Sequence, residues 1–153
     1  MTKDLAIVTT TFYNNSEDGR LRRDLARDFF RAVIEKEYRA FAVDGGTDNG
    51  NFLEELRGLG VFAFEETQHG LGGSRREALK HATSYAETNG VADMRILWTE
   101  PEKVDLVEKV QELHDTAITT GADLIVPSRN SLNSYPLAQQ WSESFGNQRH
   151  SDH

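Results

Sequence analysis

The chain has 153 residues, of which 27% are charged and 37% hydrophobic, as expected for one soluble globular domain. It contains no cysteine, which excludes disulfide bonds, thiolate catalysis and cysteine-ligated zinc. The formal net charge of -8 argues against general nucleic-acid binding, which needs a basic face. No apolar stretch approaches the roughly 20 residues that span a bilayer, and the N-terminus does not resemble a signal peptide, so we expect a cytoplasmic protein.

The first third of the sequence predicts a strand, a polar loop and a long helix. Residues 5–11 are rich in β-branched side chains, which favour a strand, and a polar loop follows over 13–19. Apolar residues spaced by three and four predict an amphipathic helix over 21–34. Its buried stripe is expected to comprise Leu21, Leu25, Phe29, Ala32 and Val33. Basic residues alternate here with aspartates and predict a solvated, ion-paired face, formed by Arg20, Arg22, Arg23, Arg27 and Arg31.

The middle of the chain repeats the alternation of strand and helix. Strands are expected over 39–43 and 61–64, and a short helix between them ends near Gly60. Ser74 is expected to cap a further helix that runs to about Thr88.

The last third predicts two more strands and two more helices. A strand is expected over 94–98, and Pro101 suits the first turn of the helix that follows. The buried stripe of this helix is expected to be Val104, Val107, Val110, Leu113 and Ile118. Residues 124–126 predict a fifth strand, and 137–145 a final helix. This order predicts an α/β protein of three layers, α/β/α, whose mainly parallel sheet binds ligands at the carboxyl ends of its strands.

An acidic, glycine-rich turn follows the second strand. Asp44 is the last residue of the apolar run, and Gly45 and Gly46 come directly after it. A carboxylate at this position can accept hydrogen bonds from a nucleobase N–H or from ribose hydroxyls, and glycines permit close approach. The same residues are equally typical of a tight turn that caps a helix, and the motif alone does not decide between the two roles.

A second glycine-rich segment follows the third strand. Gly70-Leu-Gly-Gly73 leads into the helix that carries Arg75 near its start. Backbone N–H groups at a helix start, together with a guanidinium one turn further on, can hold a diphosphate. This segment is not a P-loop, because no Gly-Lys-Ser or Gly-Lys-Thr follows.

Taken in order, the strand ends resemble those of the family-2 glycosyltransferases of the GT-A fold, which transfer a sugar from a nucleotide diphosphate sugar. Residues 43–49 resemble the family's Val-Asp-Asp-Gly-Ser-Thr-Asp signature, with Asp44 on the first acidic residue and Gly45 in place of the second. The resemblance implies a single GT-A-like nucleotide-sugar-binding domain over 1–147, with 148–153 as a frayed tail.

Two further segments extend the resemblance. Residues 68–82 resemble the family's Asn-x-Gly-x-Gly-x-Ala-Arg-Asn-x-Gly segment, with Arg75 on its arginine. Residues 95–102 fall where the family carries its Asp-x-Asp metal motif, with Trp98 in place of the first aspartate and Glu100 in place of the second. Tryptophan cannot bind a metal, so a manganese or magnesium ion would depend on Glu100. The same segment is also consistent with an ordinary first turn of a helix.

The resemblance also implies which residues bind the nucleotide sugar. Pro127-Ser128-Arg129 resembles the end of the family's fifth strand. The implied binding residues are Thr10, Thr11, Tyr13, Asp44, Gly46, Gly70, Arg75, Glu100 and Arg129. Enzymes of this family usually continue beyond the position of this C-terminus, and we identify no general base.

A glycosyltransferase acting on an unknown hydroxyl acceptor is therefore the leading hypothesis. One alternative is a catalytically inert or truncated nucleotide-sugar-binding module, in which a partner chain or a second copy covers the helix over 137–145. The other is a nucleotidyltransferase, which Thr10-Thr-Phe-Tyr-Asn14 disfavours because it is not the glycine-rich, basic loop that such enzymes place there.

Overall fold

The computed structural model describes residues 4–68 and 70–121. The strand expected over 124–126, the helix over 137–145, Arg129 and the tail over 148–153 lie outside the described residues. Residues up to Thr116 group as one compact unit, and the sheet and pocket belong to this unit.

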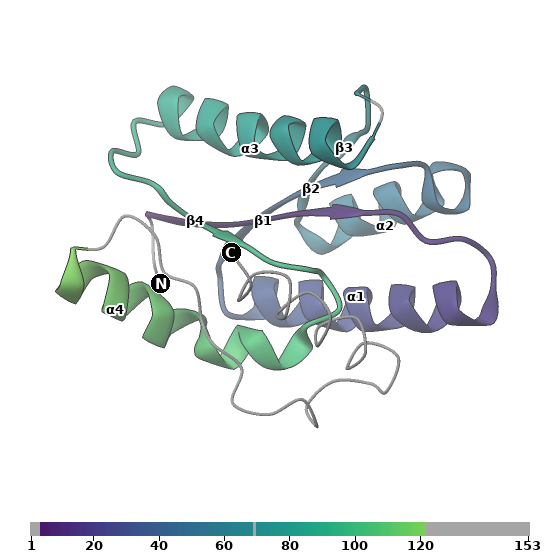
Figure 1. Ribbon diagram of the computed structural model, residues 1–153, viewed down its shortest axis with the longest axis horizontal. Helices are drawn as coiled ribbons and strands as arrows, with labels where there is room; N and C mark the ends of the chain where they lie inside the picture. The colour runs from purple at the N-terminus through teal and green to yellow at the C-terminus, as the bar shows by residue number, and fades with distance from the viewer. Residues whose placement is uncertain (1–3, 69, 122–153) are drawn as a thin grey trace, which may run out of the picture. The chain divides into compact units, whose positions relative to one another are not determined.

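The described residues form a parallel sheet of four strands in the order β3-β2-β1-β4 (Figure 1). The strands are β1 (Leu5–Thr11), β2 (Arg39–Asp44), β3 (Phe62–Glu65) and β4 (Arg95–Trp98). They lie close to the predicted positions, because each is a short apolar run between turn residues. The predicted α/β class with a parallel sheet is thus confirmed.

Helices cover both faces of the sheet, which gives three layers (Figure 1). The helices are α1 (Glu17–Glu35), α2 (Asn51–Leu59), α3 (Leu71–Thr88) and α4 (Val110–Thr120), with 3-10 turns η1 (Thr47–Gly50) and η2 (Val104–Lys109). Helices α1 and α2 pack on one face together with η2, and α3 packs on the other. Across these described helices, none is long and apolar enough to cross a membrane.

The two cores follow from the alternation of side chains along β1. Leu5 and Ile7 point into the core shared with α1 and α2, whereas Ala6 and Val8 point toward α3. The first core contains several aromatic residues, and the second contains fewer buried residues. On the α3 side the buried residues are Ala6, Val8, Phe41, Val43, Ala78 and Ala82. Two alanines four residues apart on α3 let this helix approach the sheet closely.

The buried face of α1 differs from the predicted stripe. Leu21 is 60% exposed and Leu25 is 38% exposed. The residues that α1 buries are Gly19, Ala26, Phe29, Phe30 and Val33. The prediction was right for Phe29 and Val33 but wrong for Leu21 and Leu25, because the sequence offers two overlapping stripes, and the one through the two adjacent phenylalanines buries more apolar area. The helix also begins earlier than predicted, because the Ser16 side chain accepts a hydrogen bond from the Gly19 N–H.

Two predicted helix starts were also wrong. Helix α3 begins at Leu71 after Gly70, so Ser74 lies within its first turns and is not its cap. Pro101 lies in a turn, and regular α-helix resumes only at Val110, after the 3-10 turn η2. Of the stripe predicted for this helix, Val107 and Val110 are buried, whereas Ile118 is exposed.

The aromatic core predicts a large cost for truncation of Phe29. Phe29→Ala should lower the free energy of unfolding by about 3–5 kcal/mol, because a fully buried ring is lost and a cavity remains. Phe12→Ala is the matched control, since this ring is 64% exposed and its loss should change stability by less than about 0.5 kcal/mol. Urea denaturation of both variants measures the difference, and equal costs would contradict this assignment of the core.

Candidate functional site

The strand order places a crevice at one end of the sheet. From β1 the chain adds β2 and then β3 on one side, whereas β4 pairs with β1 on the other side. The connection that leaves β1 therefore leads toward β2, whereas the connection that leaves β3 leads back across the sheet to β4, on the other side of β1. A crevice opens at the carboxyl ends of β1 and β4. Open α/β sheets bind ligands at such a switch point.

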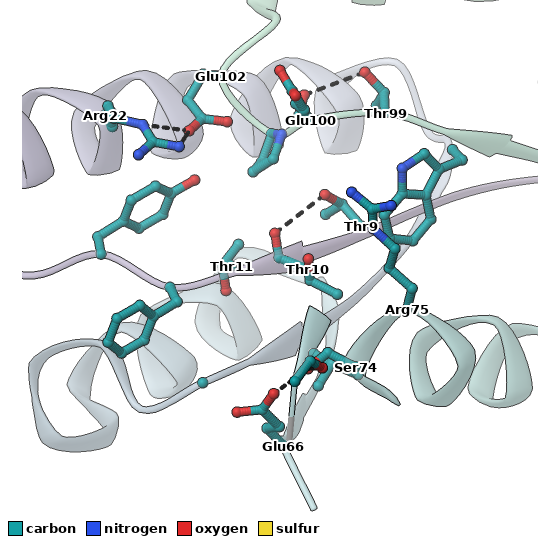
Figure 2. Close-up of a pocket in the computed structure, with 17 residues that line it drawn as sticks. Thr9, Thr10, Thr11, Arg22, Glu66, Ser74, Arg75, Thr99, Glu100 and Glu102 are labelled. Carbon is teal, nitrogen blue, oxygen red and sulfur yellow. Dashed lines mark hydrogen bonds and ion pairs between the residues drawn. The ribbon is translucent and has the colours of Figure 1, made fainter. Parts of the chain in front are cut away.

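A pocket of about 640 Å³ lies at this crevice (Figure 2). Its floor is formed by threonines of β1, and its walls come from the segments after β2, β3 and β4 and from the starts of α1 and α3. The lining residues include Thr9, Thr10, Thr11, Phe12, Tyr13, Arg22, Gly45, Glu66, Gly70, Ser74, Arg75, Trp98, Thr99, Glu100 and Glu102. The pocket thus combines hydroxyl groups, aromatic rings, carboxylates and two guanidinium groups.

Asp44 holds the turn at the edge of this pocket. Its Oδ1 accepts hydrogen bonds from the hydroxyls of Thr11 and Thr47, both at 2.7 Å. Its Oδ2 accepts from the backbone N–H groups of Gly46 at 3.0 Å and Thr47 at 2.9 Å. The Thr47 hydroxyl in turn accepts from the backbone N–H of Tyr13 at 3.0 Å. One carboxylate therefore joins the ends of β1 and β2 to the turn that follows.

This arrangement supports the tight-turn role of Asp44, and a contact between Asp44 and a nucleoside stays a prediction. The residue is 1% exposed and does not line the pocket, and its two carboxylate oxygens already accept four hydrogen bonds. Gly46 adopts a φ of 99°, in the left-handed region that favours glycine. Gly45, without a side chain, faces the pocket in place of Asp44.

Glu77 fixes the connection between β3 and α3. The side chain is buried and accepts hydrogen bonds from the Thr67 N–H and hydroxyl and from the Gln68 N–H. Burial opposes ionisation of Glu77, but these hydrogen bonds outweigh it, so the pKa of Glu77 lies below its ordinary value. The start of α3 is thereby held beside the pocket.

Arg75 lies on the α3 wall of the pocket, beside Trp98 (Figure 2). Its guanidinium lies 5.4 Å from the centre of the Trp98 ring, a cation–π arrangement that leaves its N–H groups available for an anion. Gly70 and Ser74, at the start of the same helix, line the same wall. The positive end of the α3 dipole and a guanidinium therefore point to one place.

The opposite wall contains a second guanidinium. Arg22 on α1 pairs with Glu102 at 2.7 Å and lies 5.6 Å from the centre of the Tyr13 ring. Burial and the neighbouring Glu102 raise the pKa of Tyr13, so its hydroxyl stays protonated at neutral pH. This buried hydroxyl interacts with the Glu102 carboxylate, which also pairs with Arg22.

Glu100 lines the pocket, but its surroundings do not make a cation site by themselves. Its carboxylate lies 3.7 Å from Lys103 Nζ, and Trp98 occupies the end of β4. Over the described ranges, no three His, Asp or Glu side chains are grouped to hold a metal ion. The divalent cation expected at Glu100 therefore stays a prediction, and the positive charges that the described pocket itself supplies are the two guanidinium groups.

Most of the residues singled out from the sequence meet at this pocket. Those that line it are Thr10, Thr11, Tyr13, Gly70, Arg75 and Glu100. Asp44 and Gly46 build the turn beside it, and Arg129 lies outside the described residues. Sequence reasoning missed Arg22 and Glu66. Arg22 was placed on a solvated helix face, and Glu66 has no motif of its own.

Comparisons with protein-family models, with curated proteins and with solved structures found no match.

Asp44 yields a prediction about stability. Asp44→Asn replaces one acceptor oxygen by an NH2 group and should lower the free energy of unfolding by about 2 kcal/mol, since buried donors lose their partner. Asp48→Asn is the control, because Asp48 lies nearby, is exposed and should contribute less than about 0.5 kcal/mol. Urea denaturation distinguishes the two, and an Asp44→Asn variant as stable as the control would contradict the role assigned to this carboxylate.

Glu77 yields a prediction about pH. Because its pKa is lowered on folding, its ionised form stabilises the protein above the ordinary value of 4.5, and this contribution is lost as the pH falls through the lower folded pKa. Glu77→Gln should lower the Tm by about 3 °C at pH 7, and the difference from wild type should shrink below pH 4.5. Glu87→Gln, on an exposed position of α3, is the control in the same thermal scans. A pH-independent difference would refute this explanation.

Proposed function

We propose that this chain is a GT-A-like glycosyltransferase domain that binds a nucleotide diphosphate sugar at the switch-point pocket. The main support for the proposal is that Arg75, the start of α3 and the threonine-rich end of β1 line one pocket. The motif resemblance supports the same assignment, because the implied residues that line the pocket come from three separate segments of the chain.

The pocket suggests how the donor would bind. The diphosphate would lie at the start of α3, where backbone N–H groups and the Arg75 guanidinium offer charge-assisted hydrogen bonds. The hydroxyls of Thr10 and Thr99 line the pocket and would hydrogen-bond the polar groups of the donor. The Tyr13 hydroxyl, which lies beside Glu102 in the pocket, would donate to an oxygen of the ligand.

The proposed reaction is attack by an acceptor hydroxyl on the anomeric carbon of the sugar. The bond from this carbon to the diphosphate breaks, and negative charge develops on the leaving group. Arg75 and the α3 dipole lie where they would stabilise that charge, so they would bind the transition state more tightly than the substrate.

A second candidate is a nucleotide-sugar-binding module without turnover. Trp98 favours it, because the indole occupies the end of β4 and covers Arg75, where a transferase with a cation would place a carboxylate. The two candidates predict the same binding but differ in catalysis. Release of nucleoside diphosphate from a donor sugar distinguishes them.

Calorimetric titration with UDP and GDP, with and without magnesium or manganese, tests the proposal. Wild type should bind one of the two nucleotides, and Arg75→Gln should weaken binding at least tenfold through loss of a charge-assisted hydrogen bond. Arg76→Gln is the matched control, since Arg76 is exposed on the next position and does not line the pocket. Equal loss in both variants, or no binding by wild type, would contradict the proposal.

A further inference from the structure

Gly45 leaves a space at the pocket that a neighbouring carboxylate fills. A Cβ placed on Gly45 would lie 3.2 Å from Glu66 Oε2 and 3.1 Å from Phe12 Cδ2. Both distances are tighter than ordinary van der Waals contact, so a side chain at position 45 would compete with Glu66 for the same volume. The Glu66 carboxylate therefore lies directly over the backbone of Gly45.

Glu66 is held in this position from two sides. Its backbone N–H donates to the carbonyl oxygen of Asp44 at 3.0 Å, and its Oε1 accepts a hydrogen bond from the Ser74 hydroxyl (Figure 2). Its Oε2 accepts no hydrogen bond from any other described residue. One oxygen is therefore anchored on α3, and the other remains available at the pocket wall.

An apolar surface lies beside the available oxygen. The Phe12 ring lines the pocket, is 64% exposed and contacts the same space above Gly45. A flat apolar face next to a fixed carboxylate oxygen suits a nucleoside, which has an aromatic base and donors on both its base and its ribose. It does not suit a diphosphate, which the carboxylate would repel.

We infer that Glu66 is a specificity-determining residue that binds a hydrogen-bond donor of the nucleoside in the donor substrate. This inference rests on the proposed function and divides the pocket into two parts. The diphosphate lies against Arg75, and the nucleoside lies against Glu66 and Phe12. Ser74 serves as a positioning residue, because it holds the carboxylate without facing the ligand through its own hydroxyl.

Titration of Glu66→Gln with UDP, 2′-deoxy-UDP and CDP tests this inference, and GDP, 2′-deoxy-GDP and IDP take their places if wild type binds GDP. UDP should bind at least tenfold more weakly than to wild type, because a charged acceptor becomes neutral. Glu65→Gln is the matched control, since it removes the same charge from an exposed neighbour outside the pocket lining and should leave affinity unchanged. Lost discrimination between UDP and 2′-deoxy-UDP would assign Glu66 to the ribose, and lost discrimination between UDP and CDP would assign it to the base.

Moving the carboxylate from position 66 to position 45 provides a second test. Glu66→Ala should also weaken UDP binding, and addition of Gly45→Asp should restore part of the affinity, because the new carboxylate enters the vacated space. Glu66→Gln binding as tightly as wild type, or a loss equal to that of Glu65→Gln, would overturn the inference while leaving the donor site intact. Absence of nucleotide binding by wild type would overturn both this inference and the proposed function.

Discussion

The buried carboxylate of Asp44 is the constraint on which the pocket depends. A polar side chain at 1% exposure is tolerated only when its oxygens are hydrogen-bonded, and four donors from β1 and the following turn meet this need. The ends of β1 and β2 are thereby fixed side by side, with Gly45 facing the pocket. Asp44 therefore shapes the turn at the edge of the pocket.

On the opposite side of the pocket, the carboxylate of Glu77 also holds a turn by accepting hydrogen bonds from its backbone. Glu77 holds the backbone of Thr67 and Gln68, which sets the direction in which α3 begins. Arg75 and Ser74 then face the β1 strand end from a rigid helix. Glu66 connects the two sides, because its backbone binds Asp44 and its side chain binds Ser74. Contacts with both backbone and side chains thus position the charged groups at the pocket.

Much of the fold was predictable from sequence, but the site was only partly so. Apolar runs and turn residues located the four described strands, because such periodicity depends on local burial. The face of α1 was not predictable, since Leu21 and Phe30 belong to overlapping stripes and only tertiary packing selects one. At the site, Arg75 was found through its motif. Glu66 was not predicted as a pocket residue, because it has no motif of its own and lies beside Gly45 only after folding.

Mapping of amide chemical shifts by NMR during titration with UDP or GDP tests the central claim most directly. Nucleotide binding at the switch point should shift the amides of Thr10, Thr99 and Gly73, at the carboxyl ends of β1 and β4 and the start of α3. The amides of Asp4 and Arg95, at the other end of the sheet, should remain unchanged. Shifts confined to that other end, or none at saturating nucleotide, would contradict the account.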